Sequence, residues 1–297
     1  MKIRESTGRK VFRCVNAILL SALTVICIVP FIHLLALAFS SGAEAAAGEV
    51  GLWPKGFSTE AFKYVAQKKE FFRAAGVSVL RVIVGTAISM ALVILTAYPL
   101  SKEKAQFKGR TAYVWYFAIT MFFSGGLIPT YMVIRELNLI DSFWVLVLPG
   151  AMSVWNAIIL LNFFRQIPPS LEEAAVMDGA SQLMVLVKIY LPLSLPALAT
   201  LILFTAIGNW NAWFDGVMYI NDTQKYPLQT FLSTVIVQHN YSANMAMTPE
   251  EMARLSEVGD NNLKAAQIFL GALPIVVIYP FLQRYFVKGL TIGGVKG

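Results

Sequence analysis

The polar residues with the most ordered spacing lie in residues 168–192, a segment that separates two long apolar runs. Ser170 and Glu173 are spaced as in a helix capping box. Glu172 adds a carboxylate to the same first turn, where the helix dipole favours negative charge. Gly179 follows as a typical helix stop. The pattern predicts a short, firmly capped helix of the kind that docks onto a partner.

A second short helix is expected after this glycine, with Ser181 as its cap and its end before Pro192. Ala174 and Ala175 give the first helix a surface of small side chains. A helix, a glycine turn and a second helix, held between two apolar runs, indicate a docking element.

Motifs for catalysis and for cofactor binding are missing from the sequence. It contains no G-x-x-x-x-G-K-[ST] phosphate loop, no H-E-x-x-H zinc motif and no G-x-S-x-G elbow. The two histidines, His33 and His239, fall in different predicted segments. Cys14 and Cys27 would lie about 20 Å apart on one helix, too far to bridge. We therefore expect a chain that is not an enzyme and that holds no cofactor and no metal.

The composition is that of a membrane protein. The 297 residues are 57% hydrophobic and only 14% charged, whereas soluble domains carry about 25% charged residues. The net charge of +7 is not gathered into a basic patch with interleaved aromatic residues, which argues against nucleic acid as a partner.

The apolar runs predict an all-α, polytopic fold with six transmembrane helices. The first run follows a basic start, as in a signal peptide, but it is longer than a signal core, so we expect a retained span. Gly125, Gly126 and Pro129 interrupt the third run. The expected spans cover about 15–39, 74–100, 111–132, 143–164, 193–220 and 265–286.

The basic residues predict the orientation of these spans. Short loops rich in Lys and Arg stay in the cytoplasm, and such loops occur at the N-terminus, between the second and third spans, and at the C-terminus. All three lie on one side of a six-span protein, so both termini and the segment 168–192 are expected in the cytoplasm. The loop 221–264 is then external.

The segment 168–192 resembles a signature of bacterial ABC importer permeases. Glu173-Ala174-Ala175, Gly179 and Ile189-Tyr190-Leu191-Pro192 fit the pattern E-A-A-x-x-x-G-x9-I-x-L-P at every fixed position. The closing residues 279–297 and the stretch Asn209–Trp213 are similar to the sugar-transporting, maltose-type second-permease branch. Within that branch the chain looks most like permeases for complex oligosaccharides, including uronate-containing ones of the alginate or pectin type.

The resemblance implies a type I ABC importer permease fold with a cytoplasmic coupling helix. It divides the chain into residues 1–72 (cytoplasmic N-terminus, first span, external loop), a permease core 73–287 and a cytoplasmic tail 288–297. The implied function is translocation, by alternating access, of an oligosaccharide delivered by a solute-binding protein. The implied contacts with the ATPase are made by Glu172, Glu173, Ala174, Ala175, Asp178 and Gly179.

The resemblance also implies the partners. These are a second homologous permease in a heterodimer, two ATPase subunits that bind ATP and Mg²⁺, an extracellular or periplasmic binding protein, and an oligosaccharide substrate, for which an anionic sugar is a candidate. The implied location is the bacterial inner membrane. Candidate contacts with the binding protein fall in the external loop, at His239, Asn240, Tyr241 and Asn244.

Polar groups inside the predicted spans are candidates for the substrate path, because such groups usually face the interior of a bundle or water. Interhelical hydrogen bonding and interfacial tryptophans are the alternatives for those in the fifth span. For Arg81 the alternatives are snorkelling, ion pairing, or complementing an anionic sugar. The candidates are Asn209, Trp210, Asn211, Trp213, Asp215 and Arg81.

Three other functions stay open: an ABC importer for another solute, a secondary transporter and a membrane enzyme. A secondary transporter would need an intramembrane carboxylate or ion site and an internal repeat. Asp215 is the only carboxylate within a predicted span, and no clear repeat is visible. A membrane enzyme would need a catalytic constellation that the sequence does not contain.

Overall fold

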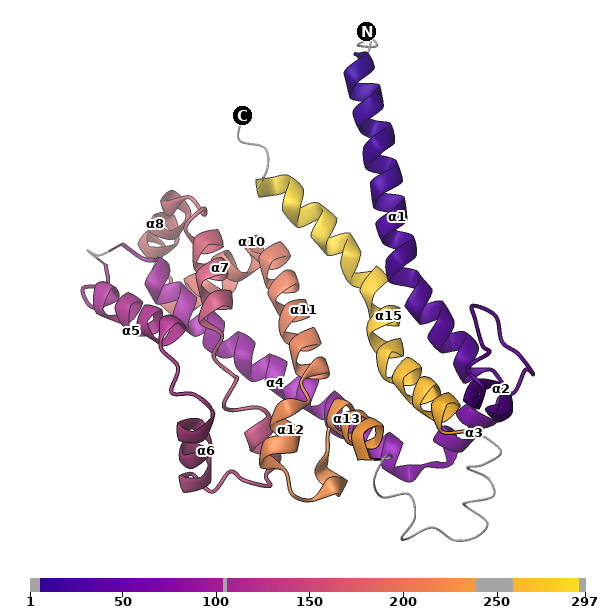
Figure 1. Cartoon of the computed structure of the whole chain (residues 1–297). Helices are drawn as coiled ribbons and strands as arrows, with labels where there is room; N and C mark the ends of the chain where they lie inside the picture. The colour runs from indigo at the N-terminus through magenta and orange to yellow at the C-terminus, as the bar shows by residue number, and fades with distance from the viewer. Residues whose placement is uncertain (1–5, 104–105, 239–258, 294–297) are drawn as a thin grey trace. The chain divides into compact units, whose positions relative to one another are not determined.

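A computed structural model describes residues 6–103, 106–238 and 259–293, with backbone alone for 235–238 and 279–293 (Figure 1). Within these ranges the chain is helical with no β-strand, which confirms the expected all-α fold.

The longer helices are α1 (Thr7–Ala38), α4 (Lys69–Ser101), α5 (Arg110–Phe122), α6 (Leu127–Glu136), α7 (Val154–Phe164), α11 (Leu195–Asn211), α13 (Leu228–Gln238) and α15 (Asp260–Gly293). The short helices are α2 (Gly42–Ala46), α3 (Glu60–Gln67), η1 (Phe143–Leu146), α8 (Pro169–Met177), α9 (Gln182–Val185), the π-turn η2 (Leu186–Tyr190), α10 (Leu191–Leu193), α12 (Phe214–Tyr219) and η3 (Thr223–Lys225).

The chain divides into two compact units, and α4 and α15 each contribute to both. Unit 1 comprises residues 1–71 and 234–273. Its polar anchor is Asn262, whose buried amide donates to the carbonyl of Ser40. Phe62 packs against Phe39 and, edge-on, against Phe269. By contrast, α1 is exposed along nearly its whole length, as expected of a helix whose apolar surface faces lipid.

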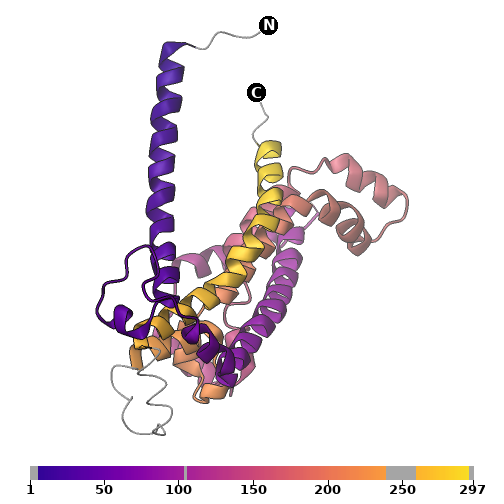
Figure 2. The same ribbon diagram turned by 90° about the vertical axis from the view of Figure 1, so that its right-hand side faces the viewer.

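Unit 2 comprises residues 72–233 and 274–297 and has a core at each end. The larger core joins α4, α7, η2 and α11 around Leu160, Phe164 and Leu201. The smaller core joins α6, η1 and α12 around Ile134 and Tyr219. Both views show α8 beside the end of α4 and α12 at the opposite end of the unit (Figures 1 and 2).

In the part of the chain that the structure describes, three helices are long and apolar enough to span a membrane, and up to five spans result if each bent pair is counted as one. These are α1, α4 and α15, together with α5–α6 and the pair 182–193 and 195–211. The expected third span is therefore not one helix, because α5 and α6 meet at 117°. Gly126 supplies the positive φ of +80° at this bend.

The fourth and fifth expected spans also differ from single helices. In the fourth, η1 is separated from α7 by residues 147–153, which are not helical. In the fifth, α11 ends at Asn211, and Ala212 takes extended dihedral angles before α12 begins. Trp213 and Thr230 are tied by a hydrogen bond from the Thr230 hydroxyl to the Trp213 carbonyl, which anchors α13 beside this break.

The segment 168–192 corrects two sequence predictions. Helix α8 begins at Pro169, because a proline at the first helical position has its φ already set. Ser170 therefore lies inside the first turn and makes no cap, so the predicted capping box does not form. Ser181 does cap α9, accepting from the Met184 amide. The second helix does not end before Pro192; helical turns continue through α10.

We expect Gly216→Ala to destabilise the protein by about 1–3 kcal/mol. A methyl group on this buried glycine would overlap the side chain of Thr230, which is fully buried and hydrogen-bonded. Gly208→Ala is the matched control, because a methyl group there meets nothing within 4 Å. Thermal unfolding of the purified protein measures both. A Gly216→Ala midpoint equal to that of Gly208→Ala would contradict the close packing of α12 on α13.

Candidate functional site

Glu172 on α8 does not face solvent. It is 7% exposed, and its carboxylate accepts from the Lys102 ammonium at 2.7 Å and from the Tyr190 hydroxyl at 2.7 Å. The Lys102 ammonium also lies 3.2 Å from the Tyr190 hydroxyl. A buried ion pair of this kind is held by hydrogen bonds from both sides. Glu172, predicted to contact a partner, thus binds residues of its own chain.

Aromatic rings complete the surroundings of this lysine. The Lys102 ammonium lies 4.0 Å from the ring centroid of Tyr98 and 4.3 Å from that of Tyr190, both within cation–π range. The Tyr98 hydroxyl donates to the side chain of Gln182 at 2.7 Å. We call Glu172, Lys102, Tyr190, Tyr98 and Gln182 the Glu172 network. It joins α8 and α9 to the end of α4.

The electrostatics favour a charged Glu172. Burial raises the pKa of its carboxyl, but hydrogen bonds from Lys102 and Tyr190, with the positive charge of Lys102, outweigh burial and lower the pKa below its usual range. For Lys102, burial lowers the pKa and Glu172 offsets part of that effect. The carboxylate is therefore kept ionised by partners that belong to the same chain.

The other predicted coupling residues lie on the outside. Glu173, Ala174 and Asp178 are exposed, and Ala175 packs partly against the core. Gly179 has a φ of +83°, so the predicted helix stop is confirmed.

Large apolar side chains are also exposed on α8 and α9. Met177 is 87% exposed and Leu183 is 66% exposed, with Leu171, Val176 and Met184 also exposed. We call these five residues, with Glu173 and Ala174, the coupling face. Exposed apolar side chains beside a polar rim are typical of a protein interaction surface.

The polar residues of the fifth span take different positions. Asn209 is half-buried and donates to the Thr86 hydroxyl at 3.4 Å. Trp210 is buried and lines a cavity of about 400 Å³ whose walls are apolar, which does not suit a sugar. Asn211 and Trp213 are exposed, on either side of the break after α11.

Arg81 on α4 is paired and does not snorkel. It is 4% exposed, and it binds the carboxylate of Asp215 with two nitrogens and the carbonyl of Ala212 at 3.2 Å. A charge neutralised in this way does not complement an anionic sugar. The pairing also leaves Asp215 without the freedom that a coupling-ion site would need, which weakens the secondary-transporter alternative.

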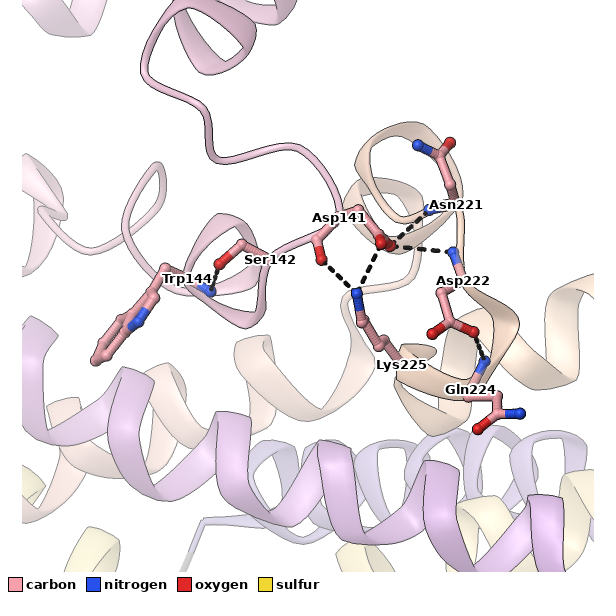
Figure 3. Close-up of polar contacts among 7 residues, drawn as sticks. All are labelled: Asp141, Ser142, Trp144, Asn221, Asp222, Gln224 and Lys225. Carbon is pink, nitrogen blue, oxygen red and sulfur yellow. Dashed lines mark hydrogen bonds and ion pairs between the residues drawn. The ribbon is translucent and has the colours of Figure 1, made fainter.

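A second polar cluster ties two loops at the other end of unit 2 (Figure 3). Asp141 accepts from the amides of Asn221 and Asp222 at 3.1 and 3.0 Å. Lys225 donates to the Asp141 carboxylate at 2.6 Å and to its carbonyl at 2.9 Å. Asp141, Asn221, Asp222 and Lys225 form what we call the outer clamp. Both of its loops are predicted to be external.

The Lys225 hydrogen bond, followed by the backbone amide of Asp222, lowers the pKa of Asp141. The same contact raises the pKa of Lys225. The predicted binding-protein contacts, His239, Asn240, Tyr241 and Asn244, lie outside the described residues. Among the described residues, no group of three or more His, Cys, Asp or Glu side chains could hold a metal ion.

Comparison with known proteins shows the family of the chain. The sequence pattern of the family "Binding-protein-dependent transport system inner membrane component" matches residues 7–292. The chain belongs to this family. It is an integral membrane permease of the ABC importer type, and the type I importer fold inferred from residues 168–192 is confirmed.

Individual relatives cover nearly the whole permease. Protein LplC of Bacillus subtilis is 41% identical over 99% of this chain and 98% of its own length. The polygalacturonan/rhamnogalacturonan transport system permease protein YtcP of the same species is 40% identical over 92% of this chain and 93% of its own. A chain of a bacterial ABC transporter involved in the import of the acidic polysaccharide alginate matches with a TM-score of 0.86, at 31% identity, over 96% of this permease and 100% of that chain.

The sequence did not reveal the partners of Glu172. Lys102 belongs to a basic loop, where it looks like one more lysine that fixes orientation, and 70 residues separate it from Glu172. Tyr190 occupies an unspecified position of the family signature. The one available signal was that Lys102 and Glu172 carry opposite charges and lie in loops predicted on the same side of the membrane.

We expect Lys102→Met to destabilise the permease by about 3–5 kcal/mol, because it leaves a buried carboxylate without its counter-ion. Glu172→Gln should cost less, and the double variant should cost less than the sum of the two. Unfolding midpoints of the four proteins give the coupling free energy. Lys108→Met, at an exposed lysine of the same loop, is the control. A coupling near zero would contradict the network.

The outer clamp predicts a pH-dependent stability. The pKa of Asp141 is lowered in the folded state, so its stabilisation is present above about pH 4, the unfolded value, and is lost as pH falls through the folded pKa. Asp141→Asn retains a side-chain oxygen that can accept hydrogen bonds, and asparagine tolerates the positive φ of 57° at this position. Wild type should be more stable than Asp141→Asn at pH 7, and the difference in melting temperature should shrink towards pH 3. A constant difference would contradict a role for the charge.

Proposed function

We propose that this permease carries an acidic oligosaccharide through the membrane as one subunit of an ATP-driven importer. The match with a chain of an alginate importer over almost the entire length is the observation that carries the proposal. That importer takes up the acidic polysaccharide alginate, and YtcP is named for the transport of polygalacturonan and rhamnogalacturonan, polymers that contain galacturonate. The sugar is a fragment of such a polymer, delivered by a solute-binding protein outside the cell.

The energy source lies on partner subunits. Two ATPases bind ATP and Mg²⁺ beneath a pair of permeases, of which this chain is one, and this chain holds no cofactor of its own. The coupling face supports this assignment, since its exposed apolar side chains, led by Met177, need a protein partner. Glu173, Ala174 and Asp178 are placed to touch the ATPase, whereas Glu172 acts from inside.

Motion reaches the membrane helices through the Glu172 network. A helix of nine residues resting on loops would tilt on its own when pushed. Here α8 is fastened by a buried ion pair to Lys102, directly after the end of α4. Displacement of α8 by the ATPase therefore moves α4 and opens the path on alternate sides. Both termini and the coupling face lie in the cytoplasm, and the outer clamp lies outside.

Arg81 does not select the acidic sugar by charge in this proposal. Its guanidinium is neutralised by Asp215, so recognition of the uronate charge falls to the binding protein and the partner permease. Exposed Asn211 and Trp213 offer an amide and an aromatic face, the usual contacts for a sugar ring, at the break of the fifth span.

We expect Met177→Asp to abolish uptake of radiolabelled trigalacturonate and to release the ATPase from the purified complex. A charge placed at the centre of an apolar contact must be desolvated on docking. Co-purification with tagged permease and uptake into membrane vesicles measure the two effects. Trp53→Asp, at an 83% exposed apolar residue in the predicted external loop, is the control and should retain both.

The substrate class is tested separately, with maltotriose as the neutral probe. Uptake of trigalacturonate at least about tenfold faster than that of maltotriose supports the acidic assignment. Equal uptake of the two would remove it while leaving the importer itself in place. Failure to co-purify any ATPase with wild-type permease would overturn the importer.

A further inference from the structure

One face of α4 contacts the end of α11, the break that follows it and the start of α13. Ser78, Arg81 and Gly85 recur on one face of the helix at i, i+3 and i+7. The Ser78 hydroxyl is fully buried and accepts from the Leu228 amide at 2.8 Å, which fixes the start of α13. Gly85 lies against the amide of Asn209, where a methyl group would come within 2.9 Å. Arg81 occupies the middle of this face.

Arg81 bridges the two helices that the break separates. Its guanidinium donates to the carbonyl of Ala212 at the end of α11, where a helix leaves carbonyls without partners. It also binds both carboxylate oxygens of Asp215, in the first turn of α12, and one of these, Oδ1, accepts from the Gly216 amide at 2.9 Å. One side chain thus satisfies the end of one helix and holds the start of the next.

We propose that Arg81 and Asp215 are a positioning pair that sets the break of the fifth span and thereby turns Asn211 towards the substrate path. The part that concerns the path rests on the proposed function; the part that concerns the break rests on geometry alone. Arg81 and Asp215 do not touch the sugar. They act through the backbone at Ala212.

The exposure of successive residues agrees with this role. Trp210 is 8% exposed, whereas Asn211 is exposed and Trp213 is 48% exposed. Asn211 is the last residue of α11, and Arg81 donates to the carbonyl of Ala212, where the backbone leaves the helix.

A buried ion pair is a costly way to achieve stability alone, because desolvation consumes most of the attraction. The Nε of Arg81 even has no hydrogen-bond partner among the described residues. The ion pair of Arg81 is therefore better explained by the conformation that it imposes on neighbouring backbone than by its own contribution to stability.

The experiment measures the water accessibility of residue 211 in the assembled transporter. A thiol reacts with maleimide as its thiolate, which forms in water and not in lipid. Cys14 and Cys27 are first replaced by Ser, and Asn211→Cys is introduced. We expect rapid labelling by a membrane-impermeant maleimide. Adding Arg81→Gln or Asp215→Asn should slow it at least about fivefold, because each leaves one charge of the pair without its partner and the break loses its anchor.

Matched variants separate positioning from general damage. Arg73→Gln removes an exposed arginine of the same helix and should leave labelling unchanged. The double variant Arg81→Gln/Asp215→Asn has no unpaired charge and should recover at least half of the labelling rate. Where Arg81→Gln does not accumulate in the membrane, Asp215→Asn gives the same test.

Transport provides the second readout, in the chain that retains Asn211. In Arg81→Gln, maximal uptake of trigalacturonate per assembled transporter should fall at least about tenfold, with the half-saturating concentration of sugar-loaded binding protein unchanged. Unchanged labelling in both single variants would overturn the positioning pair. If labelling changes as expected but the permease with native Arg81 and Asp215 transports neither sugar probe, the positioning pair is upheld and the proposed function is overturned instead.

Discussion

The buried ion pair between Glu172 and Lys102 is the contact on which the mechanical design of unit 2 depends. Both side chains are 9% exposed, and each also contacts Tyr190. Hydrogen bonds from Tyr190 to Glu172 and from Tyr98 to Gln182 add to this pair. Through these contacts, α8 is held firmly to the end of α4. The side chain that faces inward is therefore as important for the placement of α8 as those on its exposed side.

Helix α4 also makes the polar contacts at the other end of unit 2. Arg81 and Lys102 are separated along α4 by about 30 Å of helical rise. One organises the end of α11 and the start of α12, and the other organises α8 and α9. Polar contacts on α4 thus lie at the two places where neighbouring helices are short or broken. The apolar stretch between them packs into the larger core through Met90, Val93 and Ala97.

Sequence reasoning found the features that are written locally. Apolar runs gave the helical class, and Gly179 with its positive φ ended α8 as predicted. It failed where distant residues decide. The capping box at Ser170 and Glu173 did not form, because the proline at position 169 had already begun the helix. Arg81 was recognised as unusual, but Asp215 lies 134 residues away, and a single sequence carries no signal that joins them.

The bends followed the same rule. Gly125, Gly126 and Pro129 indicated an interruption of the third span, yet the angle of 117° depends on what α5 and α6 pack against. The break in the fifth span contains no glycine or proline between residues 209 and 215 that would have predicted it. It arises at Ala212 and Trp213, whose backbone is held by Arg81 and Thr230.

The bend between α5 and α6 has a further consequence for life in the bilayer. Residues 123–126 are not helical, and all four are exposed in the isolated chain. Hydrocarbon does not tolerate bare peptide groups, so irregular backbone at membrane depth must be covered by protein or wetted by a water-filled cavity. The face that carries these residues is therefore unsuited to lipid. Such cover can come from another protein chain or from a water-filled cavity beside the bend.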